Sequence, residues 1–417
     1  MSPVTGGVLP DGRAYGAARW LARRGIGEGS RVALDVPDAL PWFLGADLLG
    51  AAALVVEPSW TSRERAAVLA DASPDLVVTG LTAPPGEPVD AAGTGETFFY
   101  LPTTSGSSGR PKVLVRTRDS WWRSFAALGP LPGPVLVPGP LSSSLFLFGA
   151  LHGLWCGQDV STLSRWDAGA AVRSGAATVH LVPAMLSALL SVLERRGEPS
   201  ALRTVVCGGA HLGDEVRARF ARVLPDAELI EYYGSAEHSL IAIRRGDDGL
   251  RPVPGVELDV RDGVLWVRSP LVYSGQLLDG RLRPGGGDWS TVGDLVELTA
   301  TGALVVRGRA GSVVSSGGRL VPAEEVEAVL RTAPGVADVL VTGTPHPRLG
   351  ELVTAVVEGA PRLRELRAVA RARLAPGNRP RRWLVVQELP RTPSGKPARA
   401  LVSAQLADGT LPAEPLT

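Results

Sequence analysis

Lysine is rare in this chain of 417 residues, since only two of its 43 Lys and Arg residues are lysines. Lys112 ends the segment TTSGSSGRPK (residues 103–112), and Lys396 ends the segment RTPSGK (residues 391–396). A lysine ammonium is a compact point charge, and Arg does not replace it where a phosphate or carboxylate is held tightly. The general preference for Arg is a compositional effect without chemistry of its own. The two exceptions therefore predict loops in which a point charge is needed.

The first of these loops has the composition of an anion-binding loop. Glycines let backbone N–H groups converge on an anion, and hydroxyls add further donors. Gly109 and Lys112 are separated, so the segment is not the GxxxxGK[ST] loop of NTPases. It is also not the GxSxG elbow of hydrolases. A flexible Ser/Gly loop is the alternative interpretation. The candidate phosphate ligands are Thr104, Ser105, Gly106, Ser107, Ser108, Gly109 and Lys112.

Three further segments carry side chains suited to a nucleotide. Glu237, in EYYGSAEH (residues 231–238), is a candidate ligand for Mg²⁺, which takes one or two carboxylates together with phosphate oxygens. Tyr233 in the same segment is a candidate for stacking on a base. Asp294 in WSTVGD and Arg309 in GRAG are candidates for holding a sugar diol. Each has a plainer alternative: a strand end with an exposed Glu, a turn residue or a solvated charge.

Composition excludes several classes of protein. The formal net charge of +1 argues against nucleic-acid binding, which needs a basic face. Hydrophobic residues make up 45% of the chain, which is enough for a sizeable core and excludes disorder over most of its length.

Cys156 and Cys207 make no disulfide framework, and the first residues show no signal peptide, so a reducing cytoplasm is the expected location. Residues 124–158 lack charged side chains, but prolines and serines interrupt them, so a buried strand or helix is expected rather than a membrane span.

Strand and helix patterns alternate along the first part of the chain, which indicates βαβ units and a largely parallel sheet. Asp119 or Ser120 is expected to cap one of these helices. Short alternating strands over residues 255–306 predict a small antiparallel layer, and residues 311–417 predict a compact α+β domain. The expected fold is therefore α/β, with a large N-terminal domain of βαβ-type sheets, an antiparallel layer, and a smaller α+β C-terminal domain.

Taken in order, five segments resemble the core motifs of the adenylate-forming enzymes, which include acyl-CoA and aryl-CoA synthetases, adenylation domains of peptide synthetases, and luciferases. The segments are TTSGSSGRPK, YYGSAE, WSTVGD, GRAGSVVSSGGRLVPAEEVE and PRTPSGK. The resemblance covers essentially the whole chain. It implies a domain at residues 1–308 that binds ATP and a carboxylic acid, a hinge at residues 309–311, and a mobile domain at residues 312–417 that rotates between two half-reactions.

The resemblance also implies roles for single residues. Thr104 to Lys112 would hold the β- and γ-phosphates, Glu237 would bind Mg²⁺, and Lys396 would bridge the acyl carboxylate and the α-phosphate. Gly311 is expected at the hinge, where glycine permits a large φ/ψ change at little steric cost. Further residues expected at the nucleotide are Gly209, Ala210, Tyr233, Gly234, Ser235, Asp294 and Arg309. Those expected beside the acid are Ser143, Ser144, Gly208, Tyr232 and His238.

Three departures from the family pattern bear on activity. Ala236 stands where Thr or Ser usually precedes the metal-binding Glu, which removes one contact to the α-phosphate. Residues 141–144 read LSSS and lack both the aromatic or His that gates the acid site and the Asp that holds the α-amino group in relatives that activate amino acids. The chain is also unusually short, and the shortening is expected at residues 81–97 and 255–290.

The sequence therefore predicts an AMP-forming acid–CoA ligase that uses ATP, Mg²⁺ and CoA. One alternative keeps the acyl-adenylate but transfers it to the phosphopantetheine of a carrier protein, or to an amine, in a specialised biosynthetic pathway. A second alternative is a catalytically silent homologue that binds adenylate, against which the presence of Lys396 and Glu237 argues. The expected partner is a small carboxylic acid, with an acyl-carrier protein in the first alternative, and no nucleic acid or membrane.

Overall fold

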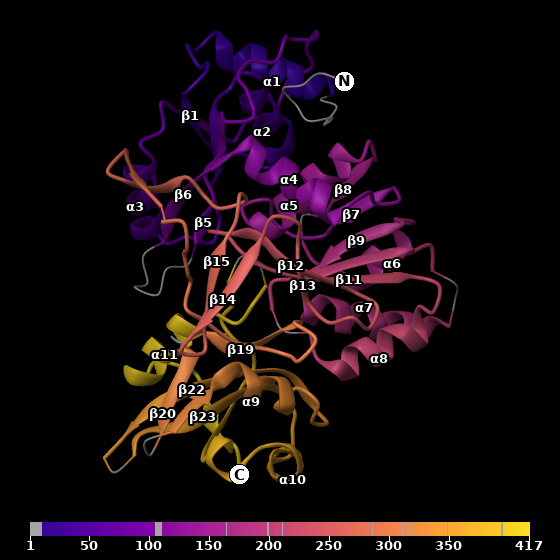
Figure 1. Cartoon of the computed structure of the whole chain (residues 1–417), viewed down its shortest axis with the longest axis vertical. Helices are drawn as coiled ribbons and strands as arrows, with labels where there is room; N and C mark the ends of the chain where they lie inside the picture. Colours follow the sequence, from indigo (N-terminus) through magenta and orange to yellow (C-terminus); the bar gives the residue numbers. More distant parts are fainter. Residues whose placement is uncertain are drawn as a thin grey trace. The chain divides into compact units, whose positions relative to one another are not determined.

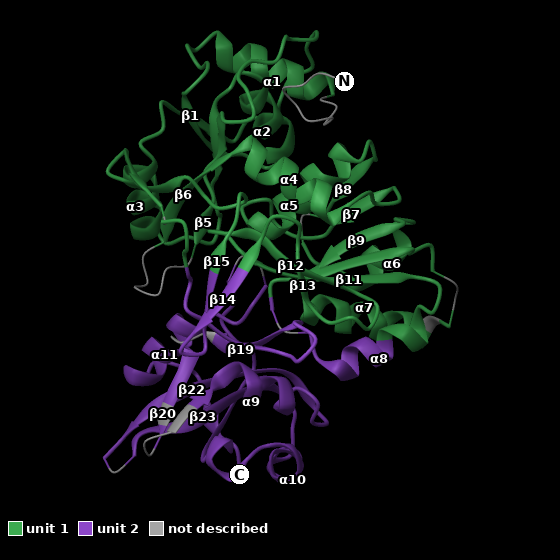
Figure 2. Ribbon diagram, in the orientation of Figure 1, with its two compact units in different colours: residues 1–209, 220–257, 267–290 green, residues 210–219, 258–266, 291–417 purple. Residues whose placement is uncertain are grey.

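The chain folds into two compact units, shown in different colours in Figure 2. Unit 1 comprises residues 1–209, 220–257 and 267–290, and unit 2 comprises residues 210–219, 258–266 and 291–417. The structure is a computed structural model. The residues that it describes are 11–104, 111–163, 165–197, 200–210, 212–285, 287–309, 312–316, 319–347, 349–392 and 395–417.

The first sheet of unit 1 has eight strands in the order β17-β16-β6-β4-β2-β1-β3, with β5 paired to β6. Figure 1 labels β1, β5 and β6 of this sheet. β1 is parallel to β2 and β3, and β2 is parallel to β4. β6 runs antiparallel to β4 and β16. The strands are β1 Arg31–Asp35, β2 Ala52–Val55, β3 Leu76–Thr79, β4 Phe98–Tyr100, β5 Thr103–Thr104, β6 Lys112–Thr117, β16 Gly275–Leu278 and β17 Arg281–Pro284.

Helices connect the parallel strands of this sheet, as parallel pairing requires. α2 Ala39–Leu48 connects β1 to β2, and α3 Ser62–Ala72 connects β2 to β3, whereas α1 Gly12–Ala22 precedes β1. α3 begins with a capping box, in which the Thr61 hydroxyl accepts from the Glu64 backbone N–H and the Glu64 carboxylate accepts from the Thr61 N–H. Val68 on α3 packs with Leu54 and Val113 in a buried apolar cluster between helix and sheet.

The second sheet of unit 1 has the order β13-β12-β11-β10-β9-β7-β8, with β11, β10, β9, β7 and β8 parallel. Its strands are β7 Val135–Val137, β8 Val160–Thr162, β9 Thr178–Leu181, β10 Thr204–Gly208, β11 Glu228–Ser235, β12 Ser239–Arg245 and β13 Arg251–Pro252. The helices along this stretch are α4 Arg118–Leu128, α5 Ser144–Trp155, α6 Ala168–Arg173, α7 Pro183–Arg196 and α8 Asp214–Val223. The uncharged segment at residues 124–158 supplies the buried helix α5.

The start of α4 differs from the prediction. Thr117 is the N-cap, and its hydroxyl accepts from the Ser120 N–H, so neither Asp119 nor Ser120 caps the helix. The prediction was wrong because Thr, Asp and Ser are all good N-cap residues, and only the end of β6 decides which of them takes the position.

The antiparallel layer forms, but not from all of the segment predicted for it. β14 Glu257–Arg261, β15 Val264–Arg268, β18 Asp294–Leu298 and β19 Leu304–Arg309 make a four-stranded sheet in that order. The hairpin of β16 and β17 lies between β15 and β18 in the sequence, yet it extends the first sheet of unit 1, where β16 pairs with β6. Short alternating strands indicate a pleated face but do not identify the sheet that they join.

The rest of unit 2 is an α+β fold around a six-stranded sheet with the order β21-β20-β23-β24-β25, in which β22 pairs with β23. Its strands are β20 Val313–Ser316, β21 Arg319–Pro322, β22 Val336–His346, β23 Gly350–Gly359, β24 Arg382–Val386 and β25 Glu414–Pro415. Its helices are α9 Ala323–Leu330, α10 Leu363–Arg373 and α11 Arg399–Ala407. One buried cluster, which includes Val326, Val341 and Leu366, packs with α9 and α10, and a second, which includes Leu340 and Val402, packs with α11.

The predicted fold class is confirmed by these sheets and by solved structures of the same architecture, described below. The domain limits predicted at residues 308 and 312 stay a prediction, because residues 310 and 311 lie outside the described residues. Among the helices that the structure describes, none combines the length and apolar character needed to cross a bilayer.

Candidate active site

The predicted phosphate loop joins β5 to β6, which pair as an antiparallel hairpin. Thr104 and Lys112 are directly opposite each other in the register of these strands, and both side chains are half-buried. The candidate ligands Ser105, Gly106, Ser107, Ser108 and Gly109 lie outside the described residues. The structure therefore brings together the two ends of the loop, and it places Lys112 on the first residue of β6.

Gly208, the last residue of β10, and Tyr232, within β11, are register partners. A Cβ on Gly208 would lie 2.4 Å from the Tyr232 ring, so no larger residue fits at position 208 without moving the tyrosine. Burial raises the pKa of the Tyr232 hydroxyl. Gly209 follows with φ of +83°, in the region that favours glycine, and leads the chain to Ala210.

β11 becomes irregular near its end and leads into the turn that carries Glu237, which lies between β11 and β12. The register of β11 against β12 shifts between Tyr233 and Gly234, and a Cβ on Gly234 would lie 2.0 Å from the Ser239 carbonyl oxygen. Only glycine therefore permits this close approach of the two strands. Ser235 ends β11, and the Glu237 side chain is half-buried in the turn before β12.

His238 is buried behind this turn and joins it to the segment that precedes β18. Its Nδ1 lies 3.1 Å from Ser235 Oγ, and its Nε2 lies 2.8 Å from Ser290 Oγ. Both ring nitrogens of His238 thus contact serine hydroxyls within unit 1.

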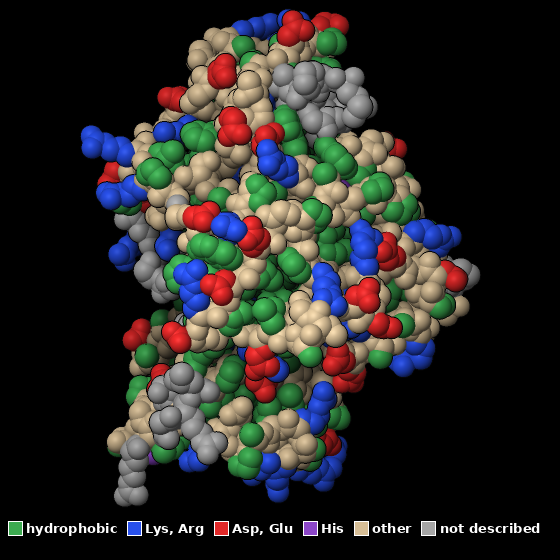
Figure 3. All heavy atoms as spheres, viewed as in Figure 1, with side chains coloured by type: hydrophobic (Ala, Val, Ile, Leu, Met, Phe, Trp, Pro, Cys, Tyr) green, Lys and Arg blue, Asp and Glu red, His purple; other side chains and the backbone are tan. Residues whose placement is uncertain are grey.

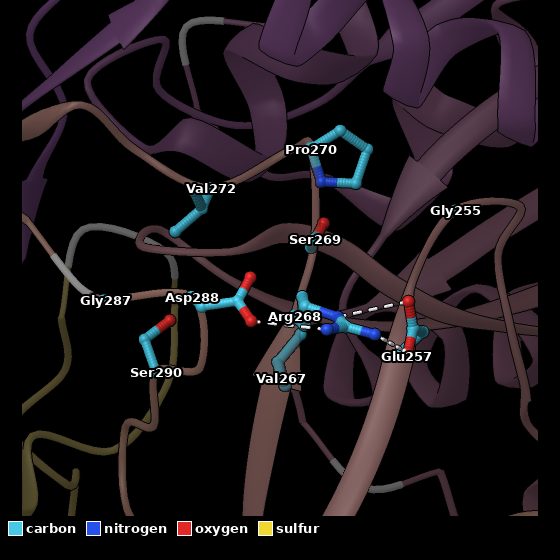
Figure 4. A pocket seen from close by; sticks show the side chains of 10 residues that line it. All are labelled: Gly255, Glu257, Val267, Arg268, Ser269, Pro270, Val272, Gly287, Asp288 and Ser290. Carbon is cyan, nitrogen blue, oxygen red and sulfur yellow. Dashed lines mark hydrogen bonds and ion pairs between the residues drawn. The ribbon is translucent and has the colours of Figure 1, made fainter.

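Ser290 also lines a pocket of about 410 Å³, in which Arg268 lies between Glu257 and Asp288 (Figure 4).

The predicted acid-site serines lie at the start of α5. Ser143 is the N-cap residue, and Ser144 Oγ lies 3.1 Å from the hydroxyl of Tyr100 on β4. Burial raises the pKa of Tyr100 to about 12, so this hydroxyl is neutral at physiological pH. Tyr100 packs at 5.0 Å between ring centroids against Trp121 of α4, which fixes its orientation.

The sequence interpretation missed Arg116, a buried residue of β6 that contacts the Glu237 turn. Its guanidinium donates to the carbonyl oxygen of Ala236 at 2.7 and 3.1 Å. Burial lowers the pKa of Arg116 to about 10, and the nearby Glu237 carboxylate opposes that shift. A signal existed in the sequence: one charged residue inside the strand KVLVRT, on the same face as Lys112 by the two-residue period.

Five predicted residues belong to unit 2: Ala210, Asp294, Arg309, Gly311 and Lys396. Asp294, at the start of β18, is 5% exposed, and it is the register partner of Arg309 at the end of β19. The two candidates for the sugar diol therefore lie opposite each other. Lys396 has a half-buried side chain, and its carbonyl oxygen accepts from the Thr392 N–H at 2.7 Å. Gly311 lies outside the described residues.

Comparison with known proteins identifies the family. Residues 81–276 match the family of AMP-binding enzymes, and residues 325–396 match the AMP-binding enzyme C-terminal domain. An uncharacterized acyl-CoA ligase of Bacillus subtilis is 28% identical, over 94% of this chain and 91% of that protein.

Two solved structures are similar in fold. The amide bond synthetase of Marinactinospora thermotolerans is 27% identical, with a TM-score of 0.79 over 95% of this chain and 93% of that one. The o-succinylbenzoate CoA synthetase of Bacillus subtilis, solved with an acyl-adenylate, has a TM-score of 0.81 over 94% and 91% of the two chains, at 21% identity. The chain thus belongs to the adenylate-forming superfamily, and the predicted class, an AMP-forming acid–thiol ligase of the acyl-CoA synthetase type, is confirmed.

Proposed function

We propose that this enzyme activates a small carboxylic acid with ATP and then transfers the acyl group to the thiol of CoA. The observation that carries the proposal is the path of β6 in unit 1. This strand begins at Lys112, the predicted phosphate lysine, and its residue Arg116 is bonded to the carbonyl group beside Glu237, the predicted metal ligand. The proposal is supported by this strand because it contains Lys112 and, through Arg116, contacts the turn that carries Glu237.

The donor set at Glu237 suits Mg²⁺. No group of three or more His, Cys, Asp or Glu residues that could hold a metal occurs in the described part of the chain. A cation that binds through one carboxylate, phosphate oxygens and water needs no such group. Glu237 would hold the ion, whose chemistry is to neutralise charge on the phosphate oxygens. Metal dependence is accordingly part of the proposal.

The proposed chemistry has two steps that differ in charge. In the first, a carboxylate oxygen attacks the α-phosphorus of ATP, the acyl-adenylate forms and pyrophosphate leaves. Both reactants are anionic, so positioning and charge stabilisation supply the catalysis. In the second, the thiol sulfur of CoA attacks the acyl carbon, AMP leaves and the thiol proton is released. We assign the cationic assistance of the first step to Lys396.

The remaining assignments follow the resemblance and are proposals. Tyr233, Asp294 and Arg309 would hold the adenosine, with Gly209, Ala210, Gly234 and Ser235 forming the backbone around it. Ser143, Ser144, Gly208, Tyr232 and His238 would surround the acid. The hydroxyls of Ser144 and Tyr100, which already contact each other, favour an acid with a polar substituent within reach of them. Gly311 would act as the hinge, and the cytoplasm would be the location.

A carrier protein is the second candidate acceptor, and a charged surface of unit 2 favours it. Residues 362–382 contain eight Arg and a single Glu, against a net charge of +1 for the whole chain. Arg364, Arg367 and Arg371 of α10 are exposed, and basic side chains gather at this end of unit 2 (Figure 3). A basic face would attract an acidic carrier domain through complementary charge. The similarity to an amide bond synthetase keeps an amine acceptor open as well.

The test is an ATP–pyrophosphate exchange screen over aryl, short-chain and medium-chain acids, followed by acceptor assays with the best acid. Free CoA, a phosphopantetheinylated carrier protein and simple amines are compared at equal concentration. Thioester formation with free CoA supports the first proposal, and exclusive transfer to the carrier protein or the amine replaces it. If a folded preparation shows no exchange with any acid, the chain is a silent homologue.

A further inference from the structure

Arg116 is a fully buried cation in unit 1, with 1% of its surface exposed. Its Nε and Nη2 both donate to the carbonyl oxygen of Ala236, at 3.1 and 2.7 Å. Its Nη1 donates to the carbonyl oxygen of Leu271 at 2.8 Å and to Ser120 Oγ at 3.2 Å. Two loops and one helix that are far apart in the sequence therefore meet at one guanidinium.

The two loops are also bonded to each other next to Glu237. The backbone N–H of Tyr273 donates to the carbonyl oxygen of Glu237 at 2.7 Å, two residues after Leu271. Arg116 thus fixes the peptide before Glu237 directly, and it fixes the peptide after Glu237 through the loop of Leu271 and Tyr273. The backbone of Glu237 is held on both sides, which fixes the point and the direction from which its side chain leaves the turn.

The charge of Arg116 acts on the same carboxylate. The hydrogen bonds described for the guanidinium end on neutral oxygens of Ala236, Leu271 and Ser120, so within this set no carboxylate neutralises it by direct contact. A buried charge interacts over longer distances than an exposed one because less water screens it. The guanidinium and the Glu237 carboxylate are close enough to attract each other, since Glu237 acts to raise the pKa of Arg116 against the effect of burial.

We infer that Arg116 is a positioning residue that orients Glu237 for the divalent cation of the bound nucleotide. This inference rests on the proposed role of Glu237 and adds a residue that the family motifs do not contain. It also explains how the turn keeps its shape with Ala236 in place of a hydroxyl residue, because the anchor is the carbonyl oxygen of that residue and not its side chain.

Arg118 provides a matched control two residues further along the chain. It is also fully buried, with 0% exposure, and its guanidinium also joins distant segments. Its Nε donates to Asp47 Oδ1 at 2.6 Å, and its Nη1 donates to the carbonyl oxygen of Ala92 at 2.8 Å. Arg118→Lys is therefore the same chemical change at equal burial, at a residue whose described bonds reach neither Glu237 nor Leu271.

The experiment compares two affinities of the intact protein by calorimetry, one for ATP with Mg²⁺ and one for ATP with EDTA. Their ratio is the contribution of the metal and does not depend on turnover. In Arg116→Lys we expect the ratio to fall by about tenfold to a hundredfold, the usual cost of losing a residue that orients a metal ligand. In Arg118→Lys we expect a change of less than about twofold, since the metal ligand keeps its support.

Two further variants make every outcome decisive. Glu237→Gln tests the proposed metal ligand: if it leaves the ratio unchanged, the ligand assignment fails and the role of Arg116 fails with it. If Glu237→Gln lowers the ratio while folded Arg116→Lys keeps it, only the positioning role is overturned. Should Arg116→Lys not fold, Ser120→Ala removes one bond to Arg116 with little disturbance. It should lower the ratio by about twofold to fivefold, and an unchanged ratio there contradicts the inference.

Discussion

The two units anchor their proposed catalytic residues in different ways. In unit 1 the Glu237 turn is held by a single buried cation, Arg116, whose described hydrogen bonds end on neutral oxygens. In unit 2 the loop that leads to Lys396 is held by ion pairs. Arg391 Nη1 donates to the carbonyl oxygen of Gly395 at 3.1 Å, and the same guanidinium bonds Asp338 at 2.9 Å and Glu358 at 2.8 Å.

The ion pairs of unit 2 continue on the other side of Lys396. Arg399, three residues later, bonds Glu327 at 2.6 Å and the carbonyl oxygen of Val341. Glu327 is 4% exposed and also accepts from the Val341 N–H at 2.7 Å. Arg331 then bonds Asp338 and Glu327, so two buried carboxylates and three guanidiniums form one network.

The difference has a physical consequence. Bonds to carbonyl and hydroxyl oxygens do not titrate, so the support that Arg116 gives to the Glu237 turn does not change with pH as long as Arg116 stays charged. A network of carboxylates loses its attractions when they are protonated. In unit 2, Arg391 is bonded to two carboxylates, those of Asp338 and Glu358. The loss of one carboxylate should therefore disturb the Lys396 loop less than the loss of Arg391, which bonds the loop directly.

The largest effect is expected for Lys396→Ala, which removes the proposed catalytic group that the ion pairs of unit 2 flank. Formation of the acyl-adenylate should fall by about 10²–10³-fold, because a charge aimed at the first transition state is lost. Thioester formation from supplied acyl-adenylate should be spared. Pyrophosphate exchange and single-turnover transfer assays measure the two steps separately. Equal losses in both would show that Lys396 does not serve the first step alone.

Acid should weaken unit 1 at a higher pH than it weakens the unit 2 network. His152 of α5 and His180 of β9 are buried in unit 1, with ring centroids 6.5 Å apart, and burial lowers their pKa values to about 4 and about 3. The unfolded chain binds protons near pH 6.5 and the folded chain does not, so stability is full above pH 6.5 and falls toward pH 4. For His152 the loss is about 3 kcal/mol at pH 4.

Denaturant unfolding between pH 7 and pH 4 measures this loss, with His180→Leu as the diagnostic variant. Neither ring nitrogen of His180 has a hydrogen-bond partner within the described structure, so leucine removes a proton site without removing a bond. The variant should lose less stability over this range than the parent. Asp338→Asn should leave the loss unchanged, because ion pairs lower the pKa of Asp338 and its contribution disappears only below about pH 4. Parallel curves for the parent and His180→Leu would contradict the assignment.

The comparison also shows what the sequence could and could not predict. Lys112 and Lys396 were recognisable because they are the two lysines of the chain and each ends a segment of special composition. Glu237 was recognisable because it stands in a segment that resembles a family motif. Asp338 and Glu327 were not, because nothing in the strand and helix that contain them marks one charge as special. Arg116 had a signal, a charge inside an apolar strand, but the strand pattern does not say what that charge contacts. The function of these residues comes from tertiary contacts, such as the bond from Arg116 to a carbonyl group 120 residues away in the sequence. The pairing of the β16–β17 hairpin with β6 was not predicted either, since strand pattern does not specify the partner strand.

A smaller effect is expected for Arg391→Ala, and Arg331→Ala is its control. Both arginines bond Asp338 at 2.9 Å, but only Arg391 also bonds the loop that carries Lys396. Arg391→Ala should slow adenylate formation about tenfold to a hundredfold, since a shift of about 1 Å in a catalytic group has that cost. Arg331→Ala should destabilise unit 2 comparably while keeping the rate of adenylate formation per folded molecule. Similar rates in the two variants would mean that the network stabilises the fold without placing the lysine.

The smallest effect is expected for Glu358→Gln, which tests whether charge or hydrogen-bond geometry holds the loop. The glutamine oxygen can still accept from Arg391 and from the Leu389 N–H, which Glu358 accepts at 2.8 and 2.9 Å. Only the charge is lost, and Asp338 remains as a second carboxylate for the same guanidinium. A partly exposed ion pair contributes about 0–1 kcal/mol, so adenylate formation should slow by less than about threefold. A loss as large as that of Arg391→Ala would show instead that the loop depends on the full negative charge around Arg391. The main difference between the two units would then be that Arg116 bonds neutral oxygens whereas Arg391 bonds carboxylates.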